Sequence, residues 1–435
     1  MPTAAQTANI AVQPQLDHLI PQSPLVRRRA PAGLGGAYHG FGPSETRGGV
    51  MLTTVTARAH IDGDSPLSTS PLANPRLRLN VVCPYYTMFP LNYPLRELAG
   101  AKDGEWVLDP FCGRGTTVFA ARLLGLPSVG IDADGVAATI AKSKLVSRTA
   151  EQIEARCEQL FASVPEPSAV PAGEFWELAF DSETLRDICR IREALLAANE
   201  SPQHVLLRAL VLGILHGPLS VKEPNYLSNQ MPRTYATKPL SAVAYWQREG
   251  LKPRRVDVGA AIARRARYLL KEVPRTVEGQ VLKGDSRAAA KLGLDRTFSH
   301  VVTSPPYLGM RTYRPDQWLR HWFIGGPADV DYSRPDMLPA APQPAFIAAL
   351  GEVWAATAKL CLPEATLAVR FGSLPSMPGD PESVLRASLA ASEAGWKVES
   401  VTSAGPSTLG KRQAMQMGRA GQAVDEIDLR ARLVA

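Results

Sequence analysis

The feature that most restricts the fold of this 435-residue chain is a glycine-rich turn between an apolar run and a helix-like segment. The pattern predicts, in order, a strand over 105–108, a turn over 109–115, a helix over 116–124 and a strand over 128–131. Asp132 directly follows the second strand. Strand, turn, helix, strand and acid in this order predict the first half of a doubly wound, mostly parallel α/β sheet.

The turn has the composition of a ligand-binding loop. Gly113 and Gly115 let the backbone approach a ligand closely, and the helix starting at Thr116 offers free N–H groups. A carboxylate is favoured at that helix end, and Asp132 lies where such folds place an acid against ribose hydroxyls. The incomplete G-x-G-x-x-G pattern argues against a nicotinamide or flavin dinucleotide. A glycine turn that binds nothing is the alternative.

The α/β alternation is interrupted and then returns. Residues 136–215 have a mainly helical pattern, 217–240 are Pro-rich, and 257–272 predict a basic helix. Further strands are predicted over 277–282, 298–303, 365–371 and 396–402, with helices over 344–360 and 381–394. We therefore expect a Rossmann-like sheet whose two halves are separated in sequence by a helical insertion.

Positive charge is concentrated in the insertion. The net charge of the chain is +7, and residues 201–280 contain 13 Lys and Arg against 5 Asp and Glu. A localised basic surface is what a polyanionic partner requires. A solvated helical face rich in arginine is the alternative.

Composition also restricts the class of protein. Residues 1–75 are rich in Pro, Ala, Gly, Ser and Thr without periodicity, which predicts a disordered or loosely attached arm. The five cysteines are scattered and form no C-x-x-C pair, so we expect no disulfide framework and no metal site. No apolar run is long enough to span a bilayer and no secretory signal is evident, so we expect a cytoplasmic protein without membrane association.

A second chemical motif follows the predicted strand at 298–303. The residues of this turn suit the exocyclic amine of a nucleic-acid base as substrate. Such an amine is a poor nucleophile because its lone pair is delocalised into the ring. The Ser304 hydroxyl and the Pro305 carbonyl can accept the two amine hydrogens and localise that pair, while Pro305 and Pro306 stiffen the turn. Tyr307 offers a flat face to a base rotated out of the helix. A plain Pro-Pro turn is the alternative.

These motifs together resemble the S-adenosylmethionine-dependent amino-methyltransferases of DNA. The resemblance covers most of residues 83–403 and rests on five motifs: motif X at 86–90 (Y-T-M-F-P), motif I at 109–117 (D-P-F-C-G-R-G-T-T), motif II at 130–134, motif III at 284–286 and motif IV at 303–307 (T-S-P-P-Y). The insertion precedes motif III here, which departs from the group with a target-recognition region between its two halves.

The resemblance implies a class I methyltransferase fold with S-adenosylmethionine as cofactor. The implied regions are the arm at 1–75, a cofactor half at 76–140, a basic target-recognition insertion at 141–276 and a base-pocket half at 277–435. Ser304, Pro305, Pro306 and Tyr307 are implied to be catalytic. The implied cofactor-binding residues are Thr87, Met88, Phe89, Asp109, Phe111, Gly113, Gly115, Thr116, Thr117, Asp132, Asp285 and Ser304.

Within this family, Ser-Pro-Pro-Tyr resembles the cytosine-N4 enzymes, whereas Asp or Asn at the first position marks adenine-N6 enzymes. We therefore expect methylation of the cytosine N4 amine, with adenine-N6 as the alternative. Cytosine-C5 chemistry needs a nucleophilic cysteine after proline, and the chain contains no Pro-Cys pair. An RNA amino-methyltransferase and a non-catalytic DNA-binding regulator are further alternatives.

Double-stranded DNA is the expected partner, and we therefore expect the protein to be associated with the nucleoid. A cognate restriction endonuclease is a possible second partner. The sequence does not give the oligomeric state. Side chains suited to reading base edges or contacting phosphates occur in the insertion and near the C-terminus. The candidates are Asn229, Gln230, Arg233, Tyr235, Arg264, Arg265, Lys411 and Arg412.

Overall fold

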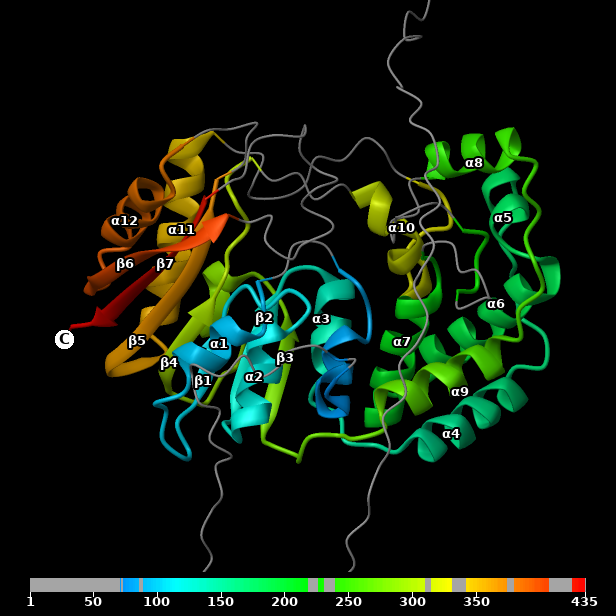
Figure 1. The fold of residues 1–435 in the computed structure, drawn as a ribbon, viewed down its shortest axis with the longest axis horizontal. Helices are drawn as coiled ribbons and strands as arrows, with labels where there is room; N and C mark the ends of the chain where they lie inside the picture. The colour runs from blue at the N-terminus through cyan, green and yellow to red at the C-terminus, as the bar shows by residue number, and fades with distance from the viewer. Residues whose placement is uncertain are drawn as a thin grey trace, which may run out of the picture. The chain divides into compact units, whose positions relative to one another are not determined.

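A seven-stranded sheet with the order β3-β2-β1-β4-β5-β7-β6 forms the centre of the structure (Figure 1). The structure is a computed structural model that describes residues 71, 73–85, 89–217, 226–230, 239–309, 314–330, 342–373, 379–406 and 425–434. The chain divides into two compact units, 1–57 and 58–435, and every described residue belongs to the second.

The sheet is parallel except at β7. Its strands are β1 (Val107–Asp109), β2 (Ser128–Asp132), β3 (Gly279–Lys283), β4 (Phe298–Thr303), β5 (Cys361–Gly372), β6 (Trp396–Pro406) and β7 (Asp425–Leu433). Pairing is antiparallel only between β7 and its neighbours β5 and β6. The strand order and the mostly parallel pairing confirm the predicted Rossmann-like sheet.

Helices cover both faces of the sheet. On one face lie α1 (Asn92–Glu97), α2 (Thr116–Leu124) and α3 (Gly135–Ser143); on the other lie η2 (Ser286–Lys291), α11 (Gln343–Ala358) and α12 (Pro381–Ala391). The short helix η1 (Pro75–Val81) packs with the helical insertion through Leu77 and Leu79. Neighbouring residues of β1 serve the two layers, since Val107 packs with α1 and α2 whereas Leu108 packs with α11 and α12.

The insertion is helical and is grouped to one side of the sheet (Figure 1). Its helices are α4 (Ala150–Ser163), α5 (Glu174–Ala179), α6 (Ser182–Ala197), α7 (Pro202–Ile214), α8 (Pro239–Arg248) and α9 (Val258–Leu269). Their apolar core is continuous with Phe119 of α2 and with Val136 and Ile140 of α3. The helix α10 (Arg314–Phe323), which follows the motif at 303–307, joins the same core through Trp318 and Trp322.

A buried arginine holds the two ends of the insertion together. The Arg122 guanidinium donates to the carbonyls of Lys144 and Val146, where the chain leaves the sheet region, at 2.5 and 3.0 Å. It also donates to the carbonyls of Pro274 and Arg275, where the chain returns, at 2.6 and 3.1 Å. This pairing fixes the base of the insertion against α2.

Several elements were not predicted. The short helix α5 lies within the stretch 136–215 that has a mainly helical pattern but was not predicted individually, and no helix was predicted at α8 or α10. The strand β7 follows the last strand that the sequence predicts. Ile427, Leu429, Ala431 and Leu433 alternate with charged residues along β7, which is the period of a half-buried strand. Among the described helices none is long and apolar enough to cross a membrane.

Candidate active site

The glycine turn and the Pro-Pro turn meet at the carboxyl ends of two adjacent strands. β1 and β4 pair in parallel, so the residues that follow them emerge at the same edge of the sheet. The Thr303 hydroxyl donates to Oδ1 of Asp109 at 2.6 Å, and the Thr117 hydroxyl donates to the Val302 carbonyl at 3.1 Å. The strand order diverges on either side of this pair, and open α/β sheets bind ligands at such a point.

The glycines of the turn serve different purposes. Gly115 has φ of +78°, and a Cβ there would lie 2.8 Å from the Cβ of Ala141, so this position allows α2 and α3 to pack closely. Gly113 has φ of +49° and its N–H donates to Oδ2 of Asp132 at 2.8 Å. A Cβ on Gly113 would meet no described atom within 4 Å. The turn is therefore packed on its inner side and open at Gly113.

Two acids lie beside the open glycine. Asp109 is fully buried; its Oδ1 accepts from Thr303 and from the Phe111 N–H, while its Oδ2 has no hydrogen-bond partner within the described chain. Burial raises the pKa of Asp109 to about 6, and burial likewise raises the pKa of Asp132 to about 7. Both carboxyls would gain from a ligand that brings hydrogen-bond donors or positive charge.

The motif-IV residues differ in accessibility. Ser304 and Pro306 are partly exposed, whereas Pro305 and Tyr307 are buried. The Ser304 hydroxyl makes no hydrogen bond within the described chain, which leaves it available to a ligand. The ring of Tyr307 packs edge-to-face against Phe371, with 5.4 Å between the ring centres.

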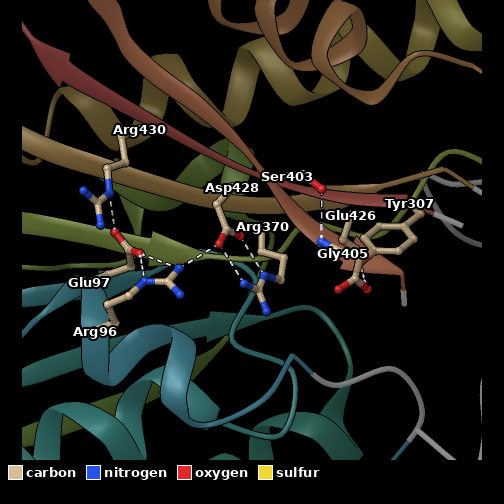
Figure 2. A network of polar contacts seen from close by, with 9 residues as sticks. All are labelled: Arg96, Glu97, Tyr307, Arg370, Ser403, Gly405, Glu426, Asp428 and Arg430. Atoms are coloured by element: carbon tan, nitrogen blue, oxygen red, sulfur yellow. Dashed lines mark hydrogen bonds and ion pairs between the residues drawn. The ribbon is translucent and has the colours of Figure 1, made fainter. Parts of the chain in front are cut away.

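Tyr307 contacts β7, which also carries a charged network shared with β5 and α1 (Figure 2). Its hydroxyl donates to Oε1 of Glu426 at 2.7 Å. Two residues further along β7, Asp428 forms two 2.7 Å contacts with the buried guanidinium of Arg370, and it also pairs with Arg96 of α1. Sequence reasoning missed Glu426 and Asp428 because β7 was not predicted.

Other expected cofactor residues surround the turn. Asp285 follows β3, and its carboxylate caps η2 and pairs with Arg287 at 2.6 Å, while the adjacent Gly284 N–H donates to the Asp132 carbonyl at 2.9 Å. Phe111 contacts Trp354 edge-on, and Phe89 contacts Tyr93 in the same manner. The expected residues Thr87 and Met88 lie outside the described residues.

The residue between the two glycines is unusual. Arg114 is 6% exposed and forms neither a hydrogen bond nor an ion pair within the described chain. Burial lowers its pKa to about 10, and the group that opposes this effect is the Cys83 thiol rather than a carboxylate. Lys144, which is fully buried nearby, donates to Oδ1 of Asn80 at 2.7 Å. Positive charge therefore accumulates beside the turn without a carboxylate partner.

The expected DNA-contacting residues of the insertion are only partly accessible. The Asn229 amide donates to the Leu178 and Leu251 carbonyls, and Gln230 is buried. Arg265 donates to the Val81 and Val82 carbonyls, whereas Arg264 is exposed. Contact of Asn229 or Arg265 with DNA would require these internal hydrogen bonds to break. The remaining candidates, Arg233, Tyr235, Lys411 and Arg412, lie outside the described residues.

The thiols and possible metal ligands are dispersed. All five cysteines are free, and four of them are buried. Within the described ranges, no three side chains of His, Cys, Asp or Glu converge as a metal-binding group.

Comparison with known proteins finds a family match at the glycine turn. Residues 85–143 match the family model described as DNA methylase. A stretch of 48 residues is 46% identical to the type II methyltransferase M2.DpnII of Streptococcus pneumoniae; it represents 11% of this chain and 18% of that protein. The chain thus matches less than a fifth of the length of this relative.

Solved structures show more distant similarity. The rRNA methyltransferase AviRa of Streptomyces viridochromogenes aligns with 86% of this chain and 96% of its own, at 13% identity and a TM-score of 0.34. TrmN of Thermus thermophilus aligns with 82% of this chain and 53% of its own, at 11% identity and a TM-score of 0.31. The fold assignment depends on the strand order and not on these matches.

The family match includes the glycine turn, both acids and α2, which carry motifs I and II of the sequence resemblance, and it implies S-adenosylmethionine as the cofactor. Over residues 85–143, the chain is thus similar to the DNA methylase family.

Proposed function

We propose that the protein transfers a methyl group from S-adenosylmethionine to the exocyclic N4 amine of cytosine in a specific double-stranded DNA sequence. The observation that carries the proposal is the hydrogen bond between Thr303 and Asp109. It joins the cofactor turn to the residue before Ser304, so a methyl donor on one and an amine on the other would be adjacent.

The residues at the turn fit the cofactor. Gly113 has open space on its outer side, and Asp109 has a buried oxygen without a hydrogen-bond partner in the described chain. We propose that Asp132 accepts from the ribose hydroxyls and that Asp109 accepts from the cofactor's ammonium group. The bound cofactor would supply an electrophilic methyl group on a sulfonium. The chain's own contribution is to hold an amine in line with it.

Motif IV would supply the acceptors for that amine. The Ser304 hydroxyl has no competing hydrogen bond within the described chain, and Pro305 and Pro306 restrict the turn that presents it. Acceptors at Ser304 and at the Pro305 carbonyl would take both amine hydrogens and localise the nitrogen lone pair. The amine becomes acidic only as it is methylated, so no strong base is required before attack.

Cytosine is proposed over adenine because Ser304 occupies the first position of motif IV. The DNA methylase match supports the reaction class and is compatible with either base. Access to the amine of a paired base requires that the base leave the helix stack, and Tyr307 would then flank it.

The insertion is proposed to contact DNA through phosphates. Lys252, Arg254 and Arg255, between α8 and α9, are exposed and have no ion pair within the described chain. Arg264 is exposed on the neighbouring helix. Each phosphate contact releases counterions, so we expect DNA affinity to fall steeply with salt concentration. Affinity that is independent of salt would contradict this role for the insertion.

A nucleoside analysis tests the reaction directly. The full-length protein is incubated with isotopically labelled S-adenosylmethionine and mixed-sequence duplex DNA, which is then digested to nucleosides. We expect the label on N4-methyldeoxycytidine. Label on N6-methyldeoxyadenosine would contradict the cytosine assignment, and cofactor binding without any labelled nucleoside would contradict the proposed activity. Ser304→Ala should lose methyl transfer while retaining cofactor affinity.

A further inference from the structure

The buried contact between Tyr307 and Glu426 has no role in the steps described so far. Both side chains are nearly inaccessible, at 9% and 4% exposure, and the phenol hydroxyl donates to the carboxylate at 2.7 Å (Figure 2). Burial and the adjacent Glu426 raise the pKa of Tyr307 well above its ordinary value. The hydroxyl therefore stays protonated and remains the donor.

The sheet is built to allow this contact. Glu426 is paired with Gly372 of β5 on one side and with Gly405 of β6 on the other. A Cβ on Gly372 would lie 3.0 Å from the Tyr307 ring and 3.2 Å from Cγ of Glu426. The absence of a side chain at residue 372 thus makes room for the Tyr307 ring and the Glu426 side chain to meet.

We propose that Glu426 is a positioning residue for methyl transfer: it fixes the Tyr307 ring beside the target base and makes the ring more electron-rich. This inference rests on the proposed function. A phenol that donates to a carboxylate gains electron density in its ring, and the face of an aromatic ring attracts positive charge.

Positive charge develops on the base during the reaction. The amine nitrogen forms a bond to the methyl carbon as the sulfur–carbon bond breaks, and the electron pair of that bond stays on sulfur. The base then carries the positive charge until a proton leaves the nitrogen for solvent. An electron-rich ring against the base stabilises this transient cation more than it stabilises the neutral base, and such differential stabilisation accelerates the reaction.

The cation nearest in effect to Tyr307 is itself paired with another carboxylate. Arg370 of β5 lies close enough to influence Tyr307, but its guanidinium forms two 2.7 Å contacts with Asp428 of the neighbouring strand β7. Arg370 thus pairs with Asp428, and the Glu426 carboxylate accepts from the Tyr307 hydroxyl.

The test compares Glu426→Gln with wild type in the full-length protein. Glutamine keeps the size and the acceptor oxygen but removes the charge. We expect the single-turnover methylation rate to fall by about 10- to 100-fold, whereas the Kd values for cofactor and DNA change less than about twofold. Glu399→Gln is the matched control, because Glu399 is an exposed carboxylate on β6 paired with Arg432, and it should behave as wild type.

A double variant distinguishes the proposed route from a general structural effect. If Glu426 acts through the Tyr307 hydroxyl, then Tyr307→Phe should slow the reaction similarly, and Glu426→Gln combined with Tyr307→Phe should be no slower than Tyr307→Phe alone. A fluorescent base analogue at the target position should still be rotated out by each variant. A wild-type rate in Glu426→Gln, or fully additive losses, would overturn the inference.

Failure of the inference is separable from failure of the proposed function. If wild type methylates DNA and Ser304→Ala does not, while Glu426→Gln is unaffected, only the role of Glu426 is wrong. If Glu426→Gln does not fold, Tyr307→Phe alone decides: a wild-type rate in that variant overturns the inference, and a comparable loss supports it.

Discussion

Individual residues at the cofactor turn are held in electrostatically unfavourable states. Asp109 is a buried acid with an unused oxygen among the described contacts, and Arg114 is a buried base without an acidic partner there. Neither arrangement stabilises the ligand-free fold, because a buried charge costs free energy unless it is paired. Such costs are typical of sites whose partner is a ligand.

We predict that Arg114→Met stabilises the cofactor-free protein by about 2 kcal/mol, since it removes a buried charge and keeps most of the packing. Urea-induced unfolding measures the change. Arg122→Met is the control: Arg122 is equally buried but donates to four carbonyls, so its replacement should be destabilising. A destabilised Arg114→Met would show that its guanidinium is already compensated.

A second residue-scale prediction concerns pH. The folded-state pKa of Asp109 is about 6, against 3.8 ordinarily, so the folded protein holds this proton more tightly than the unfolded chain. The resulting stability is present below about pH 4 and is lost as the pH rises through 6. Asp109→Asn cannot lose a proton, so its stability relative to wild type should rise by about 2 kcal/mol between pH 4 and pH 8. A constant difference across that range, in urea unfolding, would contradict this.

At the scale of elements, β7 connects the two ends of the candidate site. It lies between β5 and β6, and its charged residues reach Tyr307 on one side and α1 on the other. The helix α1 directly follows the predicted motif X. The strand β7 therefore contacts both an element next to a predicted cofactor-binding motif and Tyr307 of motif IV.

We predict that Asp428→Ala destabilises the fold by about 3 kcal/mol, because it leaves the buried Arg370 guanidinium unpaired. Glu399→Ala breaks an exposed pair with Arg432 and should cost less than about 1 kcal/mol. Thermal unfolding of both variants tests the comparison. Equal effects would mean that burial does not govern the strength of these pairs.

The local pattern predicts the elements that carry motifs. The helix 116–124 was predicted with the observed bounds, and the strand at 298–303 likewise, because glycines or polar turns mark their ends. The alternation in β7 is equally clear in the sequence, but this segment contains no motif and was not predicted as a strand. Sequence could not reveal the Thr303–Asp109 bond or the Glu426–Tyr307 contact, because both depend on pairing between residues more than 100 positions apart.

Polar composition is a weaker guide than periodicity. Asn229 and Arg265 have the chemistry of DNA-contacting residues, yet both donate to backbone carbonyls inside the protein. The same donors that read a base edge can satisfy buried carbonyls, and only the fold decides between these uses.

For the whole molecule, the insertion and the sheet share one hydrophobic core. Phe119, Val136 and Ile140 are fully buried against insertion helices. We predict that replacing residues 150–269 with a short Gly-Ser linker abolishes cooperative unfolding, because these side chains would become exposed. Circular dichroism during heating measures this, and a sharp transition in the shortened chain would show that the sheet region folds alone.

The separation of β2 from β3 also matters while the protein is being made. The two strands pair along their whole length, yet 146 residues lie between Asp132 and Gly279. At ribosomal speeds of about 5–20 residues per second, on the order of ten seconds pass between the synthesis of β2 and that of β3. During that interval its edge is an open template for other chains, so the nascent protein is expected to need protection from aggregation until the insertion has been synthesised.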